Sequence, residues 1–136
     1  MLVLKVANIV VCGHSECGAM KAVYSRNPKL KAPNLDKWLY HASNAAFRLE
    51  HEGALDESLK PHDQLSQLNV LVQIEHLMTY PIVRRQVMAG ALVLSGWWFD
   101  IATGDMYAYE RASRSFEVID RALAERLASR LASRAR

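Results

Sequence analysis

The spacing of hydrophobic and polar residues along the chain changes between two periods, which predicts a mixture of strands and helices. The run Ala7–Cys12 is rich in β-branched residues, as is typical of a buried strand in a parallel sheet covered on both faces. The run Ala91–Ile101 predicts a second buried strand of the same kind. Two shorter strands are predicted at 106–109 and 116–119, and the first of them forms a hairpin with the strand that precedes it.

Between these runs, apolar residues recur at helical spacing. We predict a short helix at 17–24 and then a loop at 25–33, where two prolines disfavour helix. One long helix is predicted from Asn34, whose side chain suits an N-cap, to Gly53. Further helices are predicted at 61–78, at 81–90 and, after an Asp120 cap, at 121–136.

Composition narrows the class of protein. The chain has 136 residues, 51% hydrophobic and 23% charged, as expected of one soluble globular domain. A net charge of +3 without a basic patch interleaved with aromatic residues gives no reason to expect a nucleic-acid partner. We expect no membrane span and no secretory signal, because the apolar runs are too short and lack a cleavage site. Two cysteines outside any disulfide framework suit the reducing cytoplasm.

The stretch Ile9–Met20 carries the candidate chemistry. Its strand ends at Gly13, and His14 and Cys17 then follow in a turn that opens a helix. Imidazole and thiolate are ligands that Zn²⁺ prefers, and a helix N-terminus favours a thiolate over a thiol. Since two ligands do not make a zinc site, the alternative is a hydrogen-bonded histidine beside a small buried cysteine.

Two segments together resemble the β-class carbonic anhydrases. The residues Leu4–Ala19 are similar to the second zinc motif of that family. The residues Leu94–Trp97, Phe99–Ile101 and Gly104 are similar to its Gly-Trp strand and hairpin. The resemblance implies an α/β fold, in which a parallel β-sheet core is flanked by helices and followed by a C-terminal β-hairpin and helix.

The resemblance also implies a domain organisation. It implies that Met1–Val6 ends a helix that leads into the zinc-site strand. Residues 1–120 are then a partial, N-terminally truncated β-carbonic anhydrase-like domain, and residues 121–136 are a basic C-terminal helix or tail. That tail would either dock on a partner or remain solvated.

The activity implied by the resemblance is reversible hydration of CO₂ to bicarbonate and a proton by zinc-bound hydroxide. Members of the family hold Zn²⁺ with two cysteines and one histidine, so His14 and Cys17 would be two of the three protein ligands. The backbone N–H of Gly18 would point toward the bound substrate. Because family members build their sites at subunit interfaces, a homodimer or higher homo-oligomer is expected.

One family motif is absent. Cys-x-Asp-x-Arg, which supplies the remaining cysteine ligand and an Asp–Arg pair, does not occur in the 136 residues, so no catalytic residue is assigned. Cys12 shares a strand face with His14 and is a candidate substitute ligand, or else a small buried hydrophobe. The absence favours an alternative function as a catalytically incomplete fragment, acting only as a weak zinc-binding or oligomerisation module. It also predicts exposed strand edges.

Other residues suggest chemistry less strongly. A redox or metal-sensing module using Cys12 and Cys17 is a third hypothesis, although their C-x₄-C spacing differs from C-x-x-C. The Trp97–Phe99 cluster suggests a ligand platform, but a strand between two packed faces explains it better. The remaining histidines, which we expect to be solvated or hydrogen-bonded rather than ligands, are His41, His51, His62 and His76.

Overall fold

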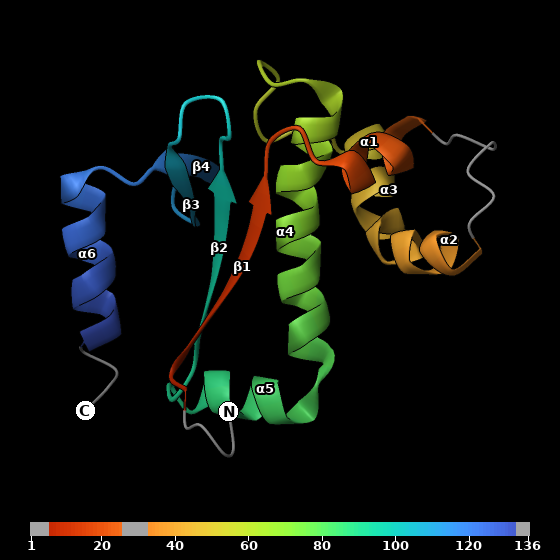
Figure 1. Ribbon diagram of the computed structural model, residues 1–136. Helices are drawn as coiled ribbons and strands as arrows, with labels where there is room; N and C mark the ends of the chain where they lie inside the picture. Colours follow the sequence, from red (N-terminus) through yellow and green to blue (C-terminus); the bar gives the residue numbers. More distant parts are fainter. Residues whose placement is uncertain (1–5, 26–32, 133–136) are drawn as a thin grey trace.

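The computed structural model describes residues 6–25 and 33–132, in which helices and strands alternate along the chain (Figure 1). The strands are β1 (Asn8–His14), β2 (Val93–Phe99), β3 (Met106–Glu110) and β4 (Ser115–Val118). The helices are α1 (Gly18–Ser25), α2 (Pro33–Leu39), the 3₁₀ turn η1 (Tyr40–Ala42), α3 (Ser43–His51), α4 (Pro61–Thr79), α5 (Pro81–Met88) and α6 (Arg121–Ala132). This order confirms the α/β class. Within these ranges, no helix is long and apolar enough to cross a membrane.

Three predictions lie wholly or largely outside the described ranges. They are the helix end at Met1–Val6, the loop at 25–33 and the last residues of the helix predicted at 121–136. The structure describes only Val6, Ser25, Pro33 and residues 121–132 of these segments.

The strands form a mixed sheet in the order β1-β2-β3-β4. β1 pairs with β2 in parallel, with Asn8 opposite Val93 and His14 opposite Phe99, and the two remaining pairs are antiparallel. The parallel pair and the predicted hairpin are therefore confirmed. Among the described residues β1 has a neighbour only on the β2 side, so its other edge is open.

The prediction that the first strand is covered on both faces is wrong. Residues along β1 alternate between exposed and half-buried, and the side chain of Val10 is 43% exposed. The half-buried positions face α4, as the contact between Gly13 and Val70 shows. No described segment covers the opposite face, so Val10, Cys12 and His14 point outward there.

The prediction of one long helix between Asn34 and Gly53 is also wrong. The chain forms α2, then η1, then α3, because Ala42 leaves the helical region at φ −93° and ψ 1°. Ala42 and Ala45 lie on either side of this break, and both are buried in the cluster that includes α4. These two side chains therefore face the interior although the helix is interrupted between them.

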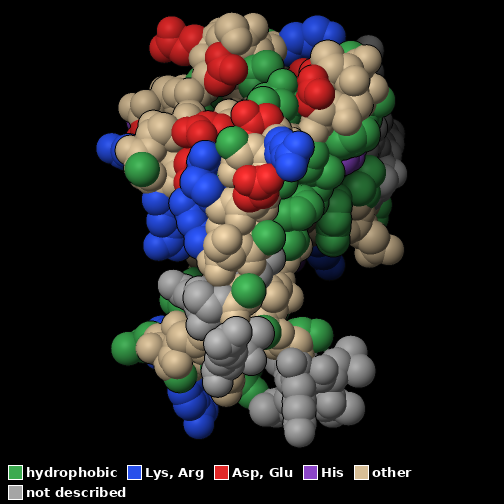
Figure 2. Space-filling view, turned by 90° about the vertical axis from the view of Figure 1, so that its left-hand side faces the viewer, with side chains coloured by type: hydrophobic (Ala, Val, Ile, Leu, Met, Phe, Trp, Pro, Cys, Tyr) green, Lys and Arg blue, Asp and Glu red, His purple; other side chains and the backbone are tan. Residues whose placement is uncertain are grey.

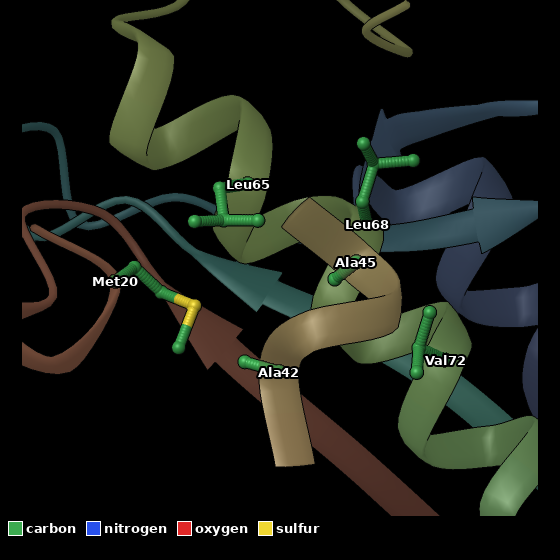
Figure 3. Close-up of a cluster of buried hydrophobic side chains, with 6 residues drawn as sticks. All are labelled: Met20, Ala42, Ala45, Leu65, Leu68 and Val72. Atoms are coloured by element: carbon green, nitrogen blue, oxygen red, sulfur yellow. The ribbon is translucent and has the colours of Figure 1, made fainter. Parts of the chain in front are cut away.

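The main hydrophobic core lies between helices rather than beneath the sheet (Figure 3). It joins α1, the η1–α3 segment and α4, and half-buried side chains such as Val23 and Leu49 pack around it. Met20 faces this core from α1, and Leu65, Leu68 and Val72 face it from α4. The buried members of the cluster are Met20, Ala42, Ala45, Leu65, Leu68 and Val72.

The other face of α4 packs closely on β1 and β2. A Cβ atom added at Gly13 would lie 2.8 Å from Val70 Cγ2, and one added at Gly96 would lie 3.0 Å from Val70 Cγ1. Trp98 is 2% exposed, and its indole N–H donates to Ser66 Oγ at 3.2 Å. Trp98 is thus packed against α4, while Trp97 and Phe99 are half-buried, so full packing on both faces of this strand is not seen.

α6 is capped at its first turn and joined to β3 by an ion pair near its end. Asp120 Oδ1 accepts a hydrogen bond from the Leu123 N–H at 2.7 Å, which confirms the predicted cap. Leu123 is buried, and Arg130 forms a bidentate ion pair with Glu110 of β3 at 2.9 and 3.0 Å. Residues 121–132 are therefore a docked helix, which lies along one side of the molecule in Figure 1.

We expect Gly13→Ala to destabilise the fold by about 1–3 kcal/mol, because the new methyl group would overlap Val70 at a packed interface. Urea denaturation followed by circular dichroism measures the change. Gly18→Ala is the matched control, since a Cβ atom there would meet nothing within 4 Å. Equal losses of stability in the two variants would contradict the close packing of α4 on β1.

Candidate metal centre

The turn between β1 and α1 holds the predicted ligands. His14 is the last residue of β1, and Cys17 directly precedes α1. Glu16 between them has φ +56°, a left-handed conformation that turns the chain from the strand into the helix. The Cys17 carbonyl accepts the Lys21 N–H at 2.9 Å, which places Cys17 as the N-cap of α1. The thiol therefore lies at the helix end that favours a negative charge.

Ser15 ties this turn to the end of β2. Its N–H donates to the Phe99 carbonyl at 2.9 Å, and its hydroxyl donates to Asp100 Oδ1 at 3.0 Å. The same hydroxyl accepts the Ile101 N–H at 2.8 Å. The Ala102 N–H, and after it the Ser15 hydroxyl, lower the pKa of Asp100 below its ordinary value of 3.8. Ser15 is buried, so its donors and acceptors are satisfied within the protein.

Side chains of α4 also hydrogen-bond to the backbone of this turn. Asp63 is buried in the first turn of α4, and its Oδ1 accepts the Glu16 N–H at 2.7 Å. One turn further along, Ser66 Oγ donates to the His14 carbonyl at 2.9 Å. The backbone on both sides of Ser15 is thus held by α4, so the positions of His14 and Cys17 are set by the fold.

The side chains of His14 and Cys17 have the chemistry of zinc ligands. His14 is exposed, and its Nδ1 lies 2.8 Å from the Ser15 carbonyl. A carbonyl can only accept, so Nδ1 carries the proton and Nε2 of the neutral ring keeps a lone pair for a metal. Cys17 is half-buried and free of any disulfide. Gly18 opens α1, where the first N–H groups have no partner within the helix.

Cys12, the candidate substitute ligand, lies on the exposed face of β1 together with His14. Its Sγ donates to the Gly13 carbonyl at 3.3 Å. Desolvation raises the pKa of the Cys12 thiol above its ordinary value of 9.0, which favours the protonated form. Cys12 and His14 therefore share a strand face, as the sequence predicts, but Cys12 has no feature that favours a thiolate.

Among the described residues, no group of three metal-binding side chains includes His14 or Cys17. Within residues 6–25 and 33–132, the metal-binding side chains that converge in a group of three are Glu16, His62 and Asp63. His14 and Cys17 thus fit Zn²⁺ by chemistry, while the number of donors is one short of a catalytic zinc site.

Sequence reasoning missed this second group because its members are distant in the chain. Glu16 forms ion pairs with Lys21 and Lys60, whose hydrogen bonds lower its pKa to about 2. Nε2 of His62 is buried and makes no hydrogen bond with any described residue, so the expectation of a solvated or hydrogen-bonded side chain is wrong for this nitrogen. Only the fold places the start of α4 beside the turn that contains Glu16.

The other histidines behave as expected. His51 Nδ1 lies 2.9 Å from the Phe47 carbonyl, and His76 Nδ1 lies 3.1 Å from Gln73 Oε1. His41 is exposed.

The fold and the turn together define an α/β protein that presents a histidine and a cysteine at the junction of a parallel strand and a helix. The family profile described as carbonic anhydrase matches residues 1–106. The chain therefore belongs to the carbonic anhydrase family, and the solved structures that it resembles place it in the β class.

Individual relatives agree with this assignment. The chain is 43% identical over 115 residues to a carbonic anhydrase of Pseudomonas aeruginosa, covering 84% of this chain and 51% of the relative. It is 36% identical over 113 residues to carbonic anhydrase 1 of Escherichia coli O157:H7, covering 83% of this chain and 51% of the relative. The chain thus spans about half the length of these curated relatives.

Solved structures show the same relationship. The β-carbonic anhydrase CcaA superposes with a TM-score of 0.76 at 30% identity, covering 88% of this chain and 54% of that one. A tetrameric β-carbonic anhydrase of the fungus Sordaria macrospora superposes with a TM-score of 0.65 at 31% identity, covering 79% of this chain and 54% of that one. The described fold is therefore that of the matching half of these enzymes.

We expect Asp100 to make the stability of the fold depend on pH in acid. Because the folded-state pKa of Asp100 lies below 3.8, its carboxylate contributes stability above that pH, and this contribution is lost as pH falls through the folded-state value. The difference in unfolding free energy between the unmodified chain and Asp100→Asn should thus shrink below pH 3.8. Urea denaturation at a series of pH values measures it, and a difference independent of pH would contradict the role of Asp100.

Proposed function

We propose that this chain carries part of the zinc centre of a β-carbonic anhydrase and serves in the reversible hydration of CO₂ to bicarbonate and a proton. The supporting observation is the anchored turn between β1 and α1. It presents His14 with a free Nε2 lone pair and Cys17 at a helix N-terminus. Relatives that share this region are named carbonic anhydrases, which supports the same reaction here.

In this proposal His14 Nε2 and Cys17 Sγ are two protein ligands of Zn²⁺. The metal supplies the Lewis acidity that makes a water molecule nucleophilic near neutral pH. The peptide N–H of Gly18 binds the substrate or the bicarbonate product, because a helix N-terminus favours an anion. The hydrogen bonds of Ser15 and Asp63 hold these three groups in place without touching the substrate.

The third protein ligand has two candidate sources. Cys12 lies on the same strand face as His14 and needs only a change of its side-chain direction and the loss of its proton. The other source is a donor from outside the described residues, next to the open edge of β1. The reaction also needs a group that positions the attacking water, and we assign no residue of this chain to that role.

A second candidate function follows from the incomplete ligand set. The chain would then be a catalytically incomplete fragment that acts as a weak zinc-binding or oligomerisation module. The open edge of β1 and the 43% exposed side chain of Val10 support it. Seen from the side of α6, a broad group of hydrophobic side chains reaches the surface (Figure 2).

We further propose that the chain forms a homodimer or higher homo-oligomer in the cytoplasm. The exposed face of β1, which includes Val10, is the surface that a second copy would cover, and a relative in Sordaria macrospora is tetrameric. The two free thiols, Cys12 and Cys17, support a reducing compartment.

Loss of either ligand should abolish zinc-dependent catalysis. We expect the unmodified chain to accelerate CO₂ hydration in a stopped-flow assay with added Zn²⁺, and His14→Ala and Cys17→Ser to fall to the uncatalysed rate. His51→Ala is the matched control and should leave the rate unchanged, since this imidazole stacks on the Phe47 ring and lies 2.9 Å from the Phe47 carbonyl in α3.

Zinc content measured on the same proteins separates the two candidate functions. Zinc that depends on His14 and Cys17, without acceleration of CO₂ hydration, would support the incomplete fragment and overturn the catalytic proposal. Unchanged zinc content in Cys12→Ser would exclude Cys12 as the third ligand.

The exposed face of β1 should govern association of the chain. Val10→Asp places a charge on this face, and burying that charge between copies would be costly. Sedimentation velocity should therefore show a smaller species for Val10→Asp than for the unmodified chain. An unchanged sedimentation coefficient at equal protein concentration would place the interface elsewhere.

A further inference from the structure

We propose that Glu16, His62 and Asp63 form a second binding site, for a first-row divalent metal ion such as Zn²⁺, separate from His14 and Cys17. One ligand atom from each of the three side chains lies within 4.8 Å of the other two. Glu16 comes from the turn after β1, while His62 and Asp63 come from the first turn of α4.

The separations match the edges of a metal coordination shell. His62 Nε2 lies 3.5 Å from Glu16 Oε2 and 3.6 Å from Asp63 Oδ1. For Zn²⁺ bound to nitrogen and oxygen at about 2.0–2.2 Å, neighbouring ligand atoms of a tetrahedron lie roughly 3.3–3.6 Å apart. Both separations from His62 Nε2 therefore match the edge of a tetrahedral shell, in which a fourth position would be left for water.

His62 Nε2 is the observation that points to a ligand. This nitrogen is buried and makes no hydrogen bond to the residues that the structure describes, although two carboxylate oxygens lie beside it. Buried polar atoms are rarely left without a partner, because an unmet donor or acceptor costs free energy. A cation between the nitrogen and the two oxygens would give His62 Nε2 the partner that it lacks.

A metal ion could enter this site by displacing the ammonium group of a neighbouring lysine. Lys60 pairs with Oε1 of Glu16, and Lys21 pairs with Oε2, the oxygen nearest His62. A metal at the proposed position would replace Lys21 on Oε2 and leave the contact with Lys60 in place. Asp63 is already held by the Glu16 N–H, so ordering the site requires the displacement of one exposed lysine.

The donor set indicates the class of metal. One imidazole and two carboxylates suit Zn²⁺, Co²⁺ or Mn²⁺, whereas Mg²⁺ and Ca²⁺ prefer oxygen donors alone. The bound ion would link the turn that follows β1 to the start of α4. It would therefore stabilise the segment that holds His14 and Cys17 without joining that centre.

The test is carried out in the H14A/C12S/C17S background of the full chain, which removes the other candidate zinc ligands. Isothermal titration with Zn²⁺ should show one ion bound per chain. Adding His62→Gln should weaken binding roughly tenfold or more, since at metal sites even outer-shell substitutions can have effects of that size. His76→Gln, which alters a histidine on the same helix, is the matched control and should leave the affinity unchanged.

A charge variant tests the exchange directly. Lys21→Met removes the ammonium group that competes for Glu16 Oε2, so Zn²⁺ should bind several-fold more tightly. Binding that is equal in the His62→Gln and His76→Gln variants, or that is unaffected by Lys21→Met, would overturn the proposal.

Should the background variant fail to fold, Co²⁺ bound to the unmodified chain and to His62→Gln replaces it. Thiolate-to-cobalt absorption bands report the cysteine-containing centre, so they should persist in His62→Gln while total bound Co²⁺ falls by one ion per chain. Unchanged total Co²⁺ would contradict the second site.

Discussion

The arrangement of the candidate centre depends on one buried carboxylate. Asp63 lies in the first turn of α4 and accepts the N–H of Glu16, which has a left-handed backbone conformation in the middle of the turn. Removing a buried acceptor of this kind costs about 1–3 kcal/mol, since the N–H loses its partner. The directions in which His14 and Cys17 leave the turn therefore depend on where α4 begins.

The position of α4 is set in turn by packing on both of its sides. Leu65, Leu68 and Val72 belong to the core that it shares with α1 and α3, while Val70 contacts Gly13 and Gly96 on the sheet. A shift of α4 along β1 would disturb both contacts, because protein interiors are close-packed. Packing of α4 therefore both stabilises the fold and sets the geometry of the turn between β1 and α1.

The open edge of β1 lies beside the candidate metal centre. His14 ends β1, and the unpaired side of that strand is where a further strand would lie. A strand paired there would run beside Cys12 and His14, and its backbone would satisfy the exposed edge. The chain spans about half the length of its curated relatives.

Most of the secondary structure of this protein can be predicted from local sequence. The apolar periods, the Asp120 cap and the proline at the start of α4 suffice to predict most strands and helices, since each depends on neighbouring residues. The His14–Cys17 spacing likewise marks a candidate metal centre. The tertiary structure alone decided the break at Ala42, the exposed face of β1 and the meeting of Glu16 with His62 and Asp63. These features depend on contacts between segments far apart in the chain, and the pattern of neighbouring residues does not predict such contacts.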